Sequence, residues 1–168
     1  DKFRVIPNTA GAFFEGIHAP APDSGTGAPS ETDRPLRIGF CGRFSSEKNW
    51  PMAREIAIEI SRRIRNIEIM MILGTNRTEG KVKQARKFLE RTEKDLGSRL
   101  HSYIDLSISE VARLYGRMDI FILTSKREPF GRTAVEAMAT QTIVLGTRAD
   151  GLPEVIGDER FLCDDTDQ

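Results

Sequence analysis

Residues 36–64 read L-R-I-G-F-C-G-R-F-S-S-E-K-N-W-P-M-A-R-E-I-A-I-E-I-S-R-R-I, and this stretch contains the unit from which the fold is built. It opens with a short apolar run, Leu36–Cys41, which a polar loop follows. Beyond the loop, apolar side chains recur at helical spacing at Ala53, Ile56, Ala57, Ile60 and Ile64. The stretch therefore predicts a buried strand, a polar loop and an amphipathic helix that Asn49 could cap and whose first turn would include Pro51.

The same alternation continues along the chain. Apolar runs bounded by Gly, Asp or Thr predict strands at Ile67–Leu73, Leu100–Ile104, Ile120–Leu123, Ile143–Leu145 and Arg160–Cys163. Helical spacing predicts helices at Lys81–Lys94, Ile108–Tyr115 and Arg132–Ala139, with Ser107 or Ser109 available to cap the second of these. Alternating strands and helices are typical of parallel βαβ units, which place helices on both faces of one open sheet. The sequence therefore predicts an α/β fold, a Rossmann-like doubly wound parallel sheet.

The composition excludes several classes of protein. Hydrophobic residues make up 39% and charged residues 30% of the 168, which is typical of a globular domain with a core of its own. Lys plus Arg and Asp plus Glu both number 25, whereas a general nucleic-acid-binding protein would show a basic excess. The apolar runs are far shorter than the roughly 20 residues that span a bilayer. Cys41 and Cys163 are too few for a disulfide framework, so we expect two buried, reduced thiols.

The chain before residue 36 has a different character. Phe3–Ile6 predicts a short strand, and residues 19–35 (A-P-A-P-D-S-G-T-G-A-P-S-E-T-D-R-P) predict a flexible loop, because such a composition cannot bury enough apolar surface to order itself. The chain also opens without Met and enters a strand almost at once. We therefore expect residues 1–168 to form a single domain that belongs to a larger protein.

The loop after the strand Leu36–Cys41 combines features that suit a diphosphate. Gly42 lets the backbone approach a ligand closely, and Arg43 and Lys48 place two cations beside a helix N-terminus that favours anions. Neither a Walker pattern nor a G-x-G-x-x-G pattern is present. The alternative is a solvated turn in which Lys48 pairs with a nearby carboxylate such as Glu47.

A second loop with two acidic neighbours runs from Thr124 into the helix that begins near Arg132. Pro129 disfavours helical geometry at Glu128, which we therefore expect in the loop. Glu136 lies more than a turn inside the helix, among small apolar residues, where a buried carboxylate needs a hydrogen-bond donor. Glu128 could be no more than an acid stabilised by the helix dipole, and Glu136 a structural acceptor. The two carboxylates alone do not decide between these roles and a ligand site.

The stretch E-P-F-G-R-T-A-V-E, from Glu128 to Glu136, resembles the E-x7-E motif of the retaining glycosyltransferases of family 4, which have the two-domain GT-B fold. Other segments resemble the same family in the same order: V-I-P-N near the start, I-G-F-C-G-R-F-S-S-E-K at the diphosphate loop, and T-I-V-L-G-T-R-A-D-G-L-P-E-V-I after the motif. The resemblance covers nearly the whole chain. It implies the C-terminal, donor-binding domain of such an enzyme, without its last helices.

The resemblance also implies roles for individual residues. Arg43 and Lys48 would neutralise the diphosphate of a UDP- or GDP-sugar, which is the leaving group. Glu136 would accept hydrogen bonds from the ribose hydroxyls, and Glu128 would contact the transferred sugar. Glu128, Arg43 and Lys48 would thus form the catalytic set. The whole donor site would comprise Gly42, Arg43, Lys48, Glu128, Phe130, Gly131, Arg132 and Glu136, with the amides at the helix start around the sugar and phosphate.

The family further implies a transfer that retains the anomeric configuration and needs no metal and no other cofactor. The acceptor (a glycan, a lipid or a small molecule) would be held by an N-terminal domain that this chain does not contain. The whole enzyme would be cytoplasmic and could associate with the cytoplasmic face of a membrane. Asp150 stands where the family has the first Gly of its G-G-x-P-E loop. The alternatives are a nucleotide-sugar-binding or regulatory module without transfer activity, and another GT-B-like enzyme such as a sugar-nucleotide epimerase.

Overall fold

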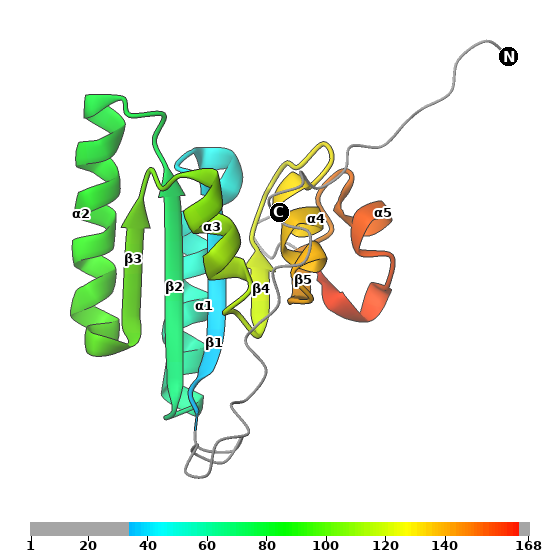
Figure 1. The fold of residues 1–168 in the computed structure, drawn as a ribbon, viewed down its shortest axis with the longest axis horizontal. Coiled ribbons are helices and arrows are strands. Elements are labelled where there is room, and N and C mark those ends of the chain that lie inside the picture. Colours follow the sequence, from blue (N-terminus) through cyan, green and yellow to red (C-terminus); the bar gives the residue numbers. More distant parts are fainter. Residues whose placement is uncertain (1–33, 165–168) are drawn as a thin grey trace, which may run out of the picture.

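A computed structural model describes residues 34–164, which form one six-stranded parallel sheet with helices on both faces (Figure 1). The strands lie in the order β3-β2-β1-β4-β5-β6. Their bounds are β1 Leu36–Arg43, β2 Ile67–Gly74, β3 Leu100–Ile104, β4 Ile120–Leu123, β5 Ile143–Thr147 and β6 Leu162–Cys163. The prediction of a doubly wound, Rossmann-like parallel sheet is confirmed.

The helices are α1 Trp50–Arg63, α2 Glu79–Leu96, α3 Ile108–Tyr115, α4 Arg132–Ala139 and α5 Leu152–Ile156. Two hydrophobic clusters divide them between the faces of the sheet. Alternate side chains of β2 point to opposite faces, so Ile69 and Met71 pack with α1 and α2, whereas Met70 and Ile72 pack with α3 and α4. Strand β2 is therefore buried on both faces from Ile69 to Leu73, which is why it is a continuous apolar run there rather than an alternating one.

The strand order reverses between β1 and β4. From β1 the chain moves outward to β2 and β3, and it then crosses back to β4 and continues to β5 and β6 on the other side. Where β1 pairs with β4, Ile38 lies opposite Ile120 and Gly39 lies opposite Phe121. The loops that leave β1 and β4 therefore turn to opposite faces of the sheet. In open α/β sheets such a switch point is where ligands bind, at the carboxyl ends of the strands.

Most predicted elements are confirmed, and the differences lie at their ends. Helix α1 begins at Trp50, between Asn49 and Pro51 as predicted, whereas α2 extends past both ends of its predicted range Lys81–Lys94, from Glu79 to Leu96. The last predicted strand, Arg160–Cys163, is wrong in its first half, because a 3-10 turn occupies Glu159–Phe161 before β6. The short helix α5 was not predicted. The predicted strand Phe3–Ile6 lies outside the described residues, as does all of the predicted loop 19–35 except its last two residues.

The two predicted helix caps have different outcomes. Ser107 caps α3 in a capping box, in which its hydroxyl accepts from the Glu110 N–H and the Glu110 carboxylate accepts from the Ser107 N–H. Asn49 precedes α1, but its side chain caps nothing. Its backbone is left-handed (φ 46°), and its amide contacts the Met52 sulfur instead. Neither Cys41 nor Cys163 forms a disulfide. The prediction of a buried thiol is wrong for Cys163, which is exposed on the short edge strand β6.

The start of α4 depends on a glycine. Gly131, which precedes α4, has a φ of +85°, and a Cβ built on it would lie 2.6 Å from Cδ2 of Leu152, a fully buried residue of α5. Helices α4 and α5 can approach this closely only because residue 131 has no side chain. The packing therefore fixes the position at which α4 begins.

We expect Gly131→Ala to destabilise the domain more than Gly157→Ala. Gly157 also has a positive φ (+73°), but a Cβ there would meet nothing within 4 Å. The change at Gly157 should therefore cost only the left-handed conformation, about 1–2 kcal/mol, while the change at Gly131 adds overpacking of about 1–3 kcal/mol. Urea unfolding measures both, and equal losses would contradict the packing account.

Candidate functional site

An ion pair joins the two loops at the switch point. Lys48, in the loop between β1 and α1, pairs through Nζ with Oε2 of Glu128, in the loop between β4 and α4. The two residues are 80 positions apart in the chain, and both side chains are largely buried, with 14% and 13% of their surface exposed. The sequence left open a nearby partner for Lys48, such as Glu47. The structure instead pairs Lys48 with Glu128, in the other candidate loop. The fold thus brings the two loops into one site.

Two further hydrogen bonds hold these loops together. The Thr124 hydroxyl, at the end of β4, donates to the Lys48 carbonyl at 2.9 Å. The Lys126 N–H donates to the Glu47 carbonyl at 2.8 Å. Thr124 is itself buried, so this bond satisfies a hydroxyl that would otherwise be costly to bury. Side-chain and backbone contacts therefore fix the Lys48 loop against the Glu128 loop.

Arg43 ends β1 and remains available to a ligand. Its side chain is 68% exposed and makes only a loose ion pair with Glu47, at 3.8 Å. The Arg43 carbonyl accepts from the Trp50 indole at 2.9 Å, so its backbone is fixed while its guanidinium is exposed. The neighbouring Gly42 lies under the Lys48 stem, since a Cβ there would come within 3.3 Å of Lys48 Cδ and Cε. Of the two predicted cations beside this strand end, Lys48 is therefore largely buried and Arg43 exposed.

Glu128 has all of its polar groups occupied. Besides the bond to Lys48, its other carboxylate oxygen accepts from the Gly131 N–H at 3.0 Å. Its own N–H donates to Asp150 at 2.8 Å, and its carbonyl accepts from the Gly151 N–H at 3.0 Å. The Gly131 amide, predicted to face a ligand, is therefore used by Glu128 in this structure. The first N–H at this helix start stabilises a carboxylate of the protein itself.

Glu136 lies in the second turn of α4 and is mostly buried, with 12% of its side chain exposed. Its recorded cation is Arg132, whose guanidinium lies 3.5 Å away and is 69% exposed. Burial raises the pKa of Glu136, although Arg132 and Lys48 both favour its charged form. Beneath it, burial raises the pKa of Cys41 to about 11 and that of Tyr115 well above its ordinary value, so both groups stay neutral. A buried carboxylate with one exposed partner is suited to accept further hydrogen bonds.

Phe130 is the last of the predicted site residues. Phe130 is half-buried in the loop, directly before Gly131. The loop that follows β2 is fixed by Thr75, whose N–H and hydroxyl both donate to the Asp105 carboxylate after β3. Those hydrogen bonds lower the pKa of Asp105 in spite of its desolvation. Asp105 therefore has a structural partner.

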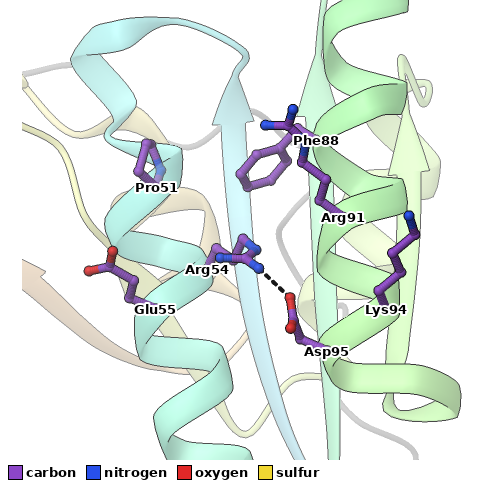
Figure 2. Close-up of a pocket in the computed structure, with 7 residues that line it drawn as sticks. All are labelled: Pro51, Arg54, Glu55, Phe88, Arg91, Lys94 and Asp95. Atoms are coloured by element: carbon purple, nitrogen blue, oxygen red, sulfur yellow. Dashed lines mark hydrogen bonds and ion pairs between the residues drawn. The ribbon is translucent and has the colours of Figure 1, made fainter.

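Two features lie outside the site. A pocket of about 500 Å³ between α1 and α2 is lined by residues such as Arg54, Phe88 and Asp95, and Figure 2 shows the ion pair of Arg54 with Asp95 across it. No predicted site residue lines that pocket. Within residues 34–164, no group of three or more His, Cys, Asp or Glu side chains could hold a metal ion. In the same part of the chain no helix is long and apolar enough to cross a membrane.

Sequence reasoning missed three polar residues that support the site. Thr124 and Thr147 are buried and donate to loop carbonyls, Thr147 to that of Ser125 at 2.6 Å. Asp150 holds the backbone of Glu128. A Thr at the end of a buried strand is a weak signal in a sequence, because its partner is a backbone group in another loop. Asp150 did stand out, as a departure from the pattern of the resembled family.

Comparison with known proteins shows the family and the fold of the chain. The family described as "Glycosyl transferases group 1" matches residues 28–168. The chain belongs to this family. Among curated members of similar sequence, the D-inositol 3-phosphate glycosyltransferase of Corynebacterium urealyticum is 29% identical over 173 residues, covering 99% of this chain and 41% of that protein. The N-acetyl-alpha-D-glucosaminyl L-malate synthase of Bacillus anthracis is 45% identical over 56 residues, 32% of this chain and 15% of that protein. The chain thus spans less than half the length of either relative.

Solved structures share the fold. The C-terminal domain of a glycosyl transferase group 1 family protein from Francisella tularensis superposes with a TM-score of 0.65 at 24% identity, covering 80% of this chain and 71% of that one. Anabaena HepE in complex with UDP and glucose superposes with a TM-score of 0.59 at 22% identity, covering 78% and 35%. At these identities the likeness establishes the fold, a GT-B-like C-terminal domain.

The raised pKa of Glu136 makes a prediction about stability and pH. The folded state holds this proton more tightly than the unfolded chain, so the contribution of Glu136 to stability falls as pH rises above its ordinary value of 4.5. Glu136→Gln removes the ionisation. We expect the unfolding free energy of the variant, relative to the parent chain, to rise between pH 4 and pH 7 in urea titrations. If the difference in unfolding free energy between Glu136→Gln and the parent chain stayed constant or fell with pH, the raised pKa of Glu136 would be contradicted.

Proposed function

We propose that this chain binds a nucleoside-diphosphate sugar at the switch point between β1 and β4, as the donor half of a retaining, metal-independent glycosyltransferase of family 4. The observation that supports this most is the Lys48–Glu128 ion pair. It joins a cation to a carboxylate that would accept hydrogen bonds from sugar hydroxyls, with Arg43 and Glu136 on the elements that flank them. The proposed donor is a UDP- or GDP-sugar.

The electrostatics suit a diphosphate that leaves during the reaction. Arg43 and Lys48 provide two positive charges at one strand end, and α4 begins beside them. Positive charge held where negative charge develops lowers the barrier to bond cleavage, which is the task a metal ion performs in other enzymes. The Lys48 ammonium has three N–H donors, so it can hold a phosphate oxygen while it keeps Glu128. Arg43, being exposed, can swing onto the second phosphate.

The carboxylates suit the two sugars of the donor. Glu136 is buried with one exposed cation as its partner, so a ribose diol would supply the donors that its oxygens lack. Glu128 would face the transferred sugar. Because Lys48 and Gly131 already occupy both of its oxygens, Glu128 is better suited to orient hydroxyl groups than to attack carbon. This favours a front-face transfer, in which the bond from the anomeric carbon to the phosphate breaks and the leaving phosphate takes the proton of the acceptor hydroxyl.

The rest of the proposed enzyme lies beyond this chain. An N-terminal domain would hold the acceptor, whether a glycan, a lipid or a small molecule, and the whole enzyme would work in the cytoplasm, with room for contact with a membrane face. The names of the corynebacterial and Bacillus relatives, a glycosyltransferase and a synthase of a glycosylated malate, agree with transfer to small hydroxyl compounds. A module that binds the donor without transferring it is the alternative.

The proposed site predicts nucleotide binding that depends on both cations. Titration calorimetry of the chain with UDP, GDP and ADP should show binding of UDP or GDP, unchanged by EDTA. Arg43→Ala and Lys48→Ala should each weaken it about tenfold, since a charge-assisted hydrogen bond contributes roughly 1.5–3 kcal/mol. Lys87→Ala, an exposed cation on α2, is the matched control and should have no effect. Absence of nucleotide binding, or equal affinity in all four proteins, would overturn the assignment.

A further inference from the structure

The loop that follows β5 supports the site by holding the loop that carries Glu128. Residues 148–151 connect β5 to α5, and they lie against the backbone of the loop that carries Glu128. The Thr147 hydroxyl donates to the Ser125 carbonyl at 2.6 Å, and both residues are buried. The Gly151 N–H donates to the Glu128 carbonyl at 3.0 Å. The two loops are therefore joined along their length and not only at their tips.

Asp150 is the one side chain in this connection that reaches Glu128. Its Oδ2 accepts from the Glu128 N–H at 2.8 Å, while the next residue, Gly151, donates to the Glu128 carbonyl. The peptide units on both sides of Glu128 are thus fixed from one turn. Since the direction of the Cα–Cβ bond follows from the backbone, fixing these units aims the carboxylate at Lys48.

The local backbone supports this role. Asp150 has a left-handed backbone (φ 42°), which Asp and Asn tolerate better than most residues because their short side chains hydrogen-bond locally. A Cβ on Gly151 would clash with the Pro129 carbonyl, so the turn must approach the Glu128 loop with glycine at 151. Asp150 is exposed, and its carboxylate therefore contributes little to the core. Its carboxylate accepts the hydrogen bond of the Glu128 N–H.

We propose that Asp150 is a positioning residue for Glu128 and thereby raises the affinity of the site for the sugar part of the donor. The proposal rests on the donor site proposed above. Lys48 holds the carboxylate of Glu128, and Asp150 holds the backbone N–H of the same residue. Without the bond to Asp150, the peptide unit before Glu128 would lose its hydrogen bond, and the carboxylate would reach both Lys48 and the sugar with poorer geometry.

Three variants separate the hydrogen bond from charge and backbone effects. Asp150→Gly keeps the left-handed backbone but removes the acceptor. Asp150→Asn keeps an acceptor oxygen and tolerates the same backbone, while it removes the charge. Gln141→Gly, at another exposed residue of positive φ (64°) in the turn before β5, is the matched control for the effect of a new glycine.

The first measurement needs no ligand. In NMR hydrogen exchange, the Glu128 amide should exchange about fivefold faster in Asp150→Gly than in the parent chain, as expected for the loss of one hydrogen bond. The side-chain resonances of Lys48 should also shift, because its partner is less well fixed. Asp150→Asn and Gln141→Gly should resemble the parent chain. Unchanged exchange at Glu128 in Asp150→Gly, or an Asn variant as altered as the Gly variant, would overturn the proposal.

The second measurement uses UDP-glucose, GDP-mannose and their nucleoside diphosphates. Asp150→Gly should lower the affinity for the bound nucleotide sugar about fivefold and leave that for the nucleoside diphosphate within about twofold. Equal losses for both ligands, or none, would overturn a role towards the sugar. If the parent chain bound none of the four compounds, the donor-binding proposal itself would fail, whereas the exchange of the Glu128 amide would still decide whether Asp150 positions Glu128.

Discussion

The ion pair between Lys48 and Glu128 is the interaction on which the site depends. It joins two loops that are 80 residues apart in the chain and that leave the sheet toward opposite faces. With both side chains largely buried, neither charge could stay without the other, since an unpaired buried charge is strongly destabilising. The pair therefore holds a cation and an acceptor at the switch point, where a ligand of the sheet would bind.

The fold brings about this meeting through strand order. Because β1 and β4 are neighbours, their carboxyl ends open side by side, and each loop needs only a few residues to reach the other. Secondary contacts then remove the remaining freedom: Thr124 bonds to the Lys48 carbonyl, and Asp150 and Gly151 bond to the backbone of Glu128. Gly131 permits α4 to begin close to α5. The result is a buried carboxylate paired with a buried cation, and one exposed cation, Arg43, beside them, which is an arrangement suited to binding an anion.

Much of the fold is predictable from the sequence, because buried parallel strands and amphipathic helices have different periods. The order of the strands is not, since periodicity says nothing about which strands are neighbours. The partner of Lys48 could not be derived from the residues for the same reason. The ends of α3 and α4 are confirmed, but the capping role of Asn49 is wrong: Asn49 is a preferred capping residue, yet its backbone is left-handed and its side chain makes no capping hydrogen bond. Asp150 and Thr124 act on backbone groups of other loops, which leave no pattern in a sequence. The roles assigned to Arg43, Lys48, Glu128 and Glu136 toward a donor stay predictions.

A double-mutant cycle on Lys48 and Glu128 tests the central claim most directly. Unfolding free energies would be measured for Lys48→Met, Glu128→Gln and the double variant, with the exposed pair Arg43 and Glu47 as a control cycle. The account predicts that the double change costs less than the sum of the single changes, by about 1–3 kcal/mol, whereas the control cycle gives a coupling near zero. Additive losses at Lys48 and Glu128 would show that the two loops are not coupled through this pair and would contradict the account.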